Sequence, residues 1–167
     1  MCSARNDEGS AVHPLTEILI AVGLVMATVS THVVGFAALL RGLVTWHVLT
    51  ISGLWRITWL MTALTCWLIM VHLIEISIWG LFYLWQGCMP DAESAFYFSG
   101  ATYTTVGYGD LVLPKPWRML APLQALTGIL MCGLSIALFF TIVGRWIRNW
   151  TRRQALTDRR SLAPKND

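Results

Sequence analysis

The chain has 167 residues, of which 56% are hydrophobic and 13% charged, with a net charge of +3 and a mean hydropathy of +0.59. This composition predicts an all-α integral membrane protein, leaves no room for a soluble domain beside the spans, and gives no reason to expect a nucleic-acid partner. The four cysteines are scattered without a Cys-x-x-Cys pair: Cys2, Cys66, Cys88 and Cys132. The histidines are dispersed as well, so we expect no disulfide scaffold, zinc site, cofactor or enzymatic centre.

The first apolar segment covers residues 15–40 and follows a polar segment, 1–14, that we expect on the outer side of the membrane. About 20 apolar residues span a bilayer as a helix, so 15–40 predicts a first transmembrane helix. A cleaved signal peptide is the alternative, but this run is too long and the segment before it is acidic. His32 lies midway in the run beside two hydroxyl residues, which favours an interhelical hydrogen-bonding group over a sensor.

Residues 41–56 form a connector whose two ends are the basic residues Arg41 and Arg56. The moderately apolar stretch between them, 43–55, is too short to cross the bilayer. We expect it to lie at the cytoplasmic interface, as a short amphipathic helix.

A second, longer apolar segment covers residues 57–86 and exceeds the length that a span needs, so we expect it to tilt or protrude. After a short outer turn, Asp91 has the position of an N-cap, and Glu93 follows in the first turn of a helix over 91–103. This helix is too short to span. We expect it to dip halfway into the membrane, with the negative end of its dipole favouring a cation.

The sequence Thr104-Thr105-Val106-Gly107-Tyr108-Gly109-Asp110 follows that helix directly. Successive carbonyls of a strand point to opposite sides, whereas dihedrals that alternate in sign turn them to one side. Gly107 and Gly109 can take positive φ without a Cβ penalty, while Val106 and Tyr108 take ordinary values between them. Four such loops around one axis would stack rings of carbonyl oxygens, with the Thr105 hydroxyls as the innermost ring.

The last apolar segment predicts an inner helix over residues 117–145, followed by a basic tail, 146–167. Within the helix, Gly128 and Gly133 are either hinges or sites of close helix packing. The tail helps to fix the orientation, and binding of anionic lipid headgroups is a second use compatible with the first. The positive residues place the tail and the 41–56 connector in the cytoplasm, and the acidic segments outside.

The filter sequence with its flanking helices closely resembles the potassium-channel pore-loop family, whose Thr-Val-Gly-Tyr-Gly motif replaces the hydration shell of K⁺ with carbonyl oxygens. The resemblance covers about residues 57–150 and implies a homotetramer, since one pore loop supplies a quarter of a filter. It implies K⁺ coordination at Thr105, Val106, Gly107 and Tyr108, with Asp110 concentrating cations at the outer mouth. The chain has a size similar to that of bacterial members of the family. This resemblance implies a location in the plasma membrane, here the bacterial inner membrane.

Many family members brace the filter with a tryptophan pair, where this chain has Tyr97 and Phe98. Tyr97 can still donate a hydrogen bond towards Asp110, but Phe98 cannot donate one, so the Tyr108 hydroxyl needs another partner. A weakly selective cation pore is therefore an alternative, and a non-conducting regulatory membrane subunit is another.

His72 and Glu75 lie three residues apart on the second span and share a helix face. Glu75 lies about 15 Å below the outer interface. A carboxyl group at this depth costs roughly 2.5–3.5 kcal/mol, so we expect it to turn inward to a partner. It either pairs with the pore or inner helix to fix packing, or acts with His72 as a proton sensor of the gate.

Overall fold

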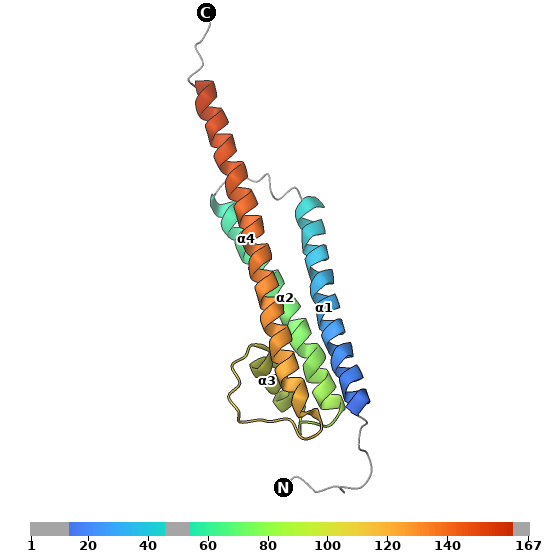
Figure 1. Cartoon of the computed structure of the whole chain (residues 1–167). Coiled ribbons are helices and arrows are strands. Elements are labelled where there is room, and N and C mark those ends of the chain that lie inside the picture. Colours follow the sequence, from blue (N-terminus) through green and yellow to red (C-terminus); the bar gives the residue numbers. More distant parts are fainter. Residues whose placement is uncertain (1–13, 46–53, 162–167) are drawn as a thin grey trace, which may run out of the picture. The chain divides into compact units, whose positions relative to one another are not determined.

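The computed structural model describes residues 14–45 and 54–161. Within these ranges every regular element is a helix (Figure 1). The elements are α1 (Pro14–Thr45), α2 (Leu54–Trp85), α3 (Ala92–Tyr103), the 3₁₀ turn η2 (Trp117–Met119) and α4 (Leu120–Ser161).

In the part of the chain that the structure describes, three segments are long and apolar enough to cross a membrane: Leu15–Thr45, Ile57–Trp85 and Trp117–Arg152. The predicted all-α membrane fold is therefore confirmed, with three spanning helices and one shorter helix between the second and the third.

Two helices are longer than their apolar runs. Helix α1 continues to Thr45, through residues that the sequence assigned to the connector, and α4 continues to Ser161, well past residue 145. The stretch after residue 145 is rich in arginine and contains no glycine or proline before Pro164, so nothing local ends the helix sooner. Most of the interfacial segment expected over 43–55 lies outside the described residues.

The chain packs as two compact units, and α1, α2 and α4 each contribute to both. The described residues of the first unit are 14–30 and 74–129, and they include α3 with the loop that follows it. Its core joins aromatic side chains of α2 to the inner face of α3 and to the start of α4: Trp79, Phe82, Tyr83, Met89, Ala95, Phe98, Leu113, Trp117 and Leu120, with Ala21 of α1.

The described residues of the second unit are 31–45, 54–73 and 130–161. Its apolar core is formed by Leu43, Leu64, Leu68 and Ile142. Helices α1 and α2 approach closely at Gly35, where an added Cβ would lie 2.7 Å from a methyl carbon of Val71. The Trp67 ring donates a hydrogen bond of 3.1 Å to the Gly35 carbonyl. The glycine thus lets the two helices pack at short distance.

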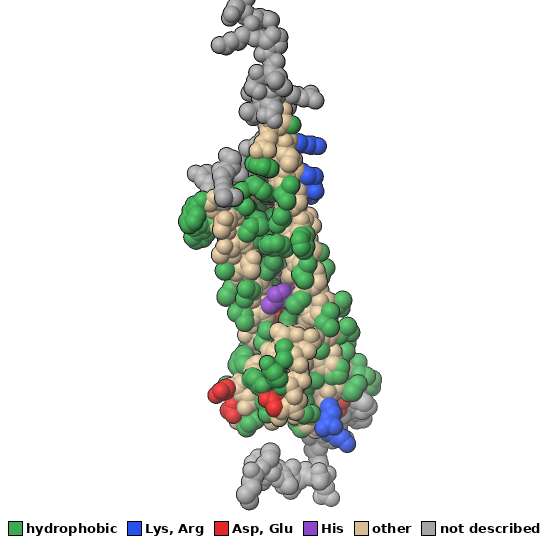
Figure 2. Space-filling view, turned by 90° about the vertical axis from the view of Figure 1, so that its left-hand side faces the viewer, with side chains coloured by type: hydrophobic (Ala, Val, Ile, Leu, Met, Phe, Trp, Pro, Cys, Tyr) green, Lys and Arg blue, Asp and Glu red, His purple; other side chains and the backbone are tan. Residues whose placement is uncertain are grey.

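The turn between α2 and α3 orients the short helix. Gly87 ends α2 with a φ of +65°, a left-handed conformation that glycine adopts at little cost. Asp91 then caps α3, as predicted, because its carboxylate accepts a bond of 2.7 Å from the Ser94 amide. Hydrophobic side chains dominate the face of the described residues seen in Figure 2, as expected for helices in contact with lipid or with other subunits.

Candidate ion filter

The loop after α3 has the alternating backbone that an ion filter needs. Thr105, Gly107 and Gly109 have φ values of +61°, +54° and +77°, whereas Val106 and Tyr108 between them are not in the positive region. The expected values at both glycines are therefore observed. Dihedrals that alternate in this way turn successive carbonyls towards one side, which an ordinary strand cannot do.

Thr105 at positive φ was not foreseen, because a β-branched residue rarely adopts this conformation. The last turn of α3 holds it there. The Thr105 amide donates to the Thr102 carbonyl at 3.0 Å, and the Gly107 amide donates to the Ala101 carbonyl at 3.1 Å. Thr104 caps the helix, and its hydroxyl donates to the Gly100 carbonyl at 2.8 Å. The filter backbone is thus hydrogen-bonded to the helix that precedes it.

Asp110 is held at the outer end of the loop. The Tyr97 hydroxyl donates to one carboxylate oxygen at 2.8 Å, and the Leu111 amide donates to the other at 3.0 Å. The Tyr97 ring also stacks on Tyr108, with centroids 6.4 Å apart and planes within 5°. The hydrogen bond to Asp110 raises the pKa of Tyr97 above its ordinary value, because the carboxylate favours the protonated phenol. The expected bond from Tyr97 to Asp110 is present.

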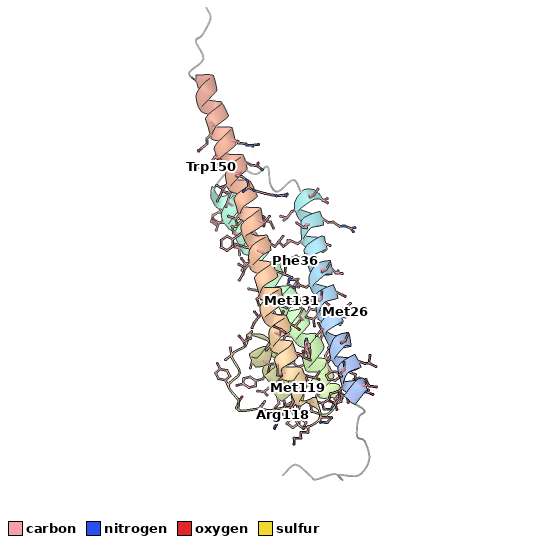
Figure 3. The ribbon with its side chains drawn as sticks, in the orientation of Figure 1. Met26, Phe36, Arg118, Met119, Met131 and Trp150 are labelled. Carbon is pink, nitrogen blue, oxygen red and sulfur yellow. The ribbon has the colours of Figure 1, made fainter. Side chains whose placement is uncertain are left out.

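Phe98 takes a different place from its neighbour. Its ring is buried in the core of the first unit and meets Tyr83 edge-on, with centroids 5.4 Å apart. Phe98 also borders a cavity of about 370 Å³ between α3, the filter loop and the start of α4. Arg118 of η2, labelled in Figure 3, lines the same cavity.

A network of buried polar side chains fixes the middle of α3. The Gln124 amide nitrogen lies 2.8 Å from the Ser99 hydroxyl, which itself donates to the Ile76 carbonyl at 2.7 Å. The Tyr83 hydroxyl donates to the Gln124 amide oxygen at 2.8 Å. Sequence reasoning missed this network. Its one usable signal was Gln124, an amide in an apolar segment, since such groups are seldom placed in a membrane without partners.

Glu75 and His72 form hydrogen bonds with residues of different helices. Glu75 is fully buried and accepts a hydrogen bond from the Tyr103 hydroxyl at the end of α3. The Nε2 of His72 lies 3.0 Å from the Ser135 hydroxyl of α4, and the His72 ring lies 5.4 Å from the ring of His32. The expected inward partner of Glu75 is therefore Tyr103 of the pore helix.

The two candidate hinge glycines differ. A Cβ on Gly128 would lie 2.1 Å from the Tyr103 carbonyl oxygen, so the backbones of α3 and α4 are in close contact there. A Cβ on Gly133 would have no atom within 4 Å apart from its chain neighbours and the backbone of its own helix. Gly128 thus serves close packing, whereas Gly133 is free of such a constraint.

The comparisons with known proteins agree with this geometry. Residues 69–145 match the model of a family described as "Ion channel" (Ion_trans_2), and they include the end of α2, α3, the filter loop and the start of α4. Searches among curated proteins and among solved structures gave no match.

Three helices long and apolar enough to span a membrane, with a shorter helix and a loop of alternating φ between the second and the third, are consistent with an ion channel. Over residues 69–145 the chain is similar to the ion-channel family, and this similarity points to a transport protein rather than to an enzyme.

Proposed function

We propose that the protein is a potassium-selective channel that conducts K⁺ passively through a homotetrameric, carbonyl-lined filter. The carbonyls of Thr105, Val106, Gly107 and Tyr108 coordinate the ions, and the Thr105 hydroxyl adds the innermost ring. The observation that carries this proposal is the alternation of positive φ at every second residue from Thr105 to Gly109. Thr104 and Gly109 support the backbone, and Asp110 attracts cations to the outer mouth.

Four chains are required because one loop presents only one quarter of a filter. In the single chain the filter residues are exposed, including Val106 at 53% and Tyr108 at 72%. Non-helical backbone at membrane depth is tolerated where protein buries it or water lines it. A fourfold assembly supplies both, since neighbouring chains cover the side chains and the central axis leaves room for ions.

We further propose a plasma-membrane location, as in a bacterial inner membrane, with the C-terminus in the cytoplasm. The basic residues near the end of the third span support this orientation. In that region Trp146 and Trp150 stack with centroids 6.2 Å apart, as residues of an interfacial belt often do. Arg145, Arg148 and Arg152 lie beside them and offer contacts for anionic headgroups.

A weakly selective cation pore is the second candidate. The observation that favours it is the burial of Phe98 against Tyr83, because this ring gives the filter no hydrogen-bond donor. Only Tyr97 of the predicted pair is bonded to the outer end of the filter. A filter with fewer braces can relax, and a relaxed filter coordinates Na⁺ more easily.

Flux from vesicles that contain the purified protein separates the candidates. A potassium channel passes K⁺ and excludes Na⁺, a weakly selective pore passes both, and a regulatory subunit passes neither. Gly107→Ala should abolish K⁺ flux, because alanine at a φ of +54° strains the filter. Gly87→Ala is the matched control, since Gly87 also has a positive φ and open space around it but lies outside the filter. Equal fluxes from the two variants would contradict the proposal.

A further inference from the structure

Tyr103 is the last residue of α3 and lies two residues before Thr105, the first residue of the proposed ion sites. Its ring is fully buried, and its side chain and its carbonyl are held by two different helices. We propose that Tyr103, together with Glu75, is a positioning residue that sets the affinity and selectivity of the innermost K⁺ site at Thr105. This inference rests on the proposed channel function.

The side chain of Tyr103 is held from α2. Its hydroxyl donates to Glu75, and both groups are withdrawn from solvent. A buried polar pair of this kind has strong geometric preferences, because neither group can exchange its partner for water. The bond therefore fixes how far the end of α3 lies from α2.

The backbone of Tyr103 is held from α4. An added Cβ at Gly128 would meet the Tyr103 carbonyl oxygen at 2.1 Å and ring carbon Cγ at 3.2 Å. At this distance α3 cannot approach α4 further. The last turn of α3 thus lies between a hydrogen bond on one side and a backbone contact on the other.

Hydrogen bonds connect this turn directly to the filter backbone, so a displacement of the turn also displaces the filter. The carbonyls of Ala101 and Thr102, in the same turn as Tyr103, accept hydrogen bonds from the amides of Gly107 and Thr105. Thr105 is held at a φ of +61°, which an isolated threonine rarely adopts, so its conformation depends on these bonds. Ion-binding oxygens must be held within about 0.5 Å of their productive positions. A shift of the turn therefore changes the innermost ring first.

The middle of α3 is held by hydrogen bonds of its own, so a change at the end of α3 can be distinguished from a loss of the whole helix. Ser99 lies one turn earlier and is bound by Gln124 and by the Ile76 carbonyl. Loss of the bond between Tyr103 and Glu75 should consequently loosen the end of α3 without releasing the whole helix. The expected defect is in ion binding rather than in folding alone.

The test compares Tyr103→Phe with Tyr83→Phe. Both tyrosines are buried and both donate through their hydroxyl to one side chain, but Tyr83 bonds to Gln124, away from the filter loop. Two quantities are measured on the full chain: the K⁺ concentration that gives half-maximal protection of the tetramer against heat, and the ratio of K⁺ to Na⁺ flux. Tyr103→Phe should raise that concentration by roughly threefold to tenfold, the effect of one lost hydrogen bond, and lower the ratio.

Tyr83→Phe should lower heat stability equally at all K⁺ concentrations, with an unchanged half-maximal concentration. Glu75→Gln keeps an acceptor oxygen and the side-chain volume, so it should behave much like the parent protein, whereas Glu75→Leu should show the defect of Tyr103→Phe. Adding Glu75→Leu to Tyr103→Phe should change little further. If Tyr103→Phe and Glu75→Leu both behave like Tyr83→Phe, the inference is wrong. A parent protein without K⁺-dependent protection or selective flux would instead refute the channel proposal itself.

Discussion

At Gly128 the packing of two helices depends on the lack of a single methyl group. Gly128→Ala would place a Cβ 2.1 Å from the Tyr103 carbonyl oxygen, and a backbone atom cannot move aside as a flexible side chain can. We expect a loss of about 1–3 kcal/mol in stability, typical of overpacked cores. Thermal unfolding of the purified protein measures this loss.

Gly133→Ala is the control for that substitution. Apart from its chain neighbours and the backbone of its own helix, no atom lies within 4 Å of a Cβ at Gly133, so alanine should be neutral there, or stabilising by roughly 0.5–1 kcal/mol through its better helix propensity. If the alanine variants of Gly128 and Gly133 unfold at the same temperature, close packing is not the role of Gly128.

Tyr97 offers a pH-dependent test at the outer end of the filter. Tyr97→Phe keeps the ring that stacks on Tyr108 but removes the hydrogen bond to Asp110, so the variant should be less stable than the parent protein at neutral pH. The pKa of Tyr97 is raised in the folded protein, so its contribution is fully present below the ordinary tyrosine value of about 10 and is lost as the pH rises through the folded value. Heat-stability curves of both proteins should therefore converge at high pH. A constant difference at all pH values would contradict this assignment.

At the scale of elements, the network around Gln124 connects three helices within the first unit. Gln124→Leu keeps a similar volume but leaves the hydroxyls of Tyr83 and Ser99 without their described partner on α4. Leaving buried polar groups unsatisfied costs about 1–3 kcal/mol, so we expect a loss of this size in thermal or denaturant unfolding. Leu123→Ala, at an exposed neighbouring position, should change stability much less. A loss for Leu123→Ala equal to that for Gln124→Leu would argue against the network.

The sequence predicted those elements whose cause is local. Asp91 was identifiable as an N-cap, and Gly107 and Gly109 as positions of positive φ, because residue type alone decides such conformations. Thr105 was not predictable, since its φ is imposed by amide bonds to the preceding helix rather than by its own preference. The partner of Gln124 was equally hidden, because it depends on which helices meet, and a single sequence does not contain that information.

The extension of α4 suggests a further test of how this element meets the membrane. Arg145, Arg148 and Arg152 recur at a spacing that places them on one helix face, next to the stacked pair Trp146 and Trp150. Replacing the three arginines by glutamine should remove the stabilisation that anionic lipid gives, worth about 1 kcal/mol per residue near the surface. Heat stability in vesicles with and without phosphatidylglycerol measures this. The loss should be absent in zwitterionic lipid, and a loss in both lipids would indicate a different role for the arginines.

At the scale of the whole molecule, the proposed assembly brings four sets of filter carbonyls and four Asp110 side chains around one axis. Oxygen dipoles and carboxylates that face one another repel, and bound K⁺ offsets this repulsion. Replacing K⁺ with Na⁺ should therefore lower the temperature at which the tetramer dissociates. Dissociation of the tetramer should also expose Val106 and Tyr108 to solvent or lipid, because both side chains are exposed in the single chain. Native mass measurements during heating in the two salts give the result.

Gly107→Ala should remove the difference between the salts while Gly87→Ala preserves it, since only the first glycine lies in the filter. A monomer in both salts, or identical dissociation temperatures, would contradict an ion-stabilised fourfold filter.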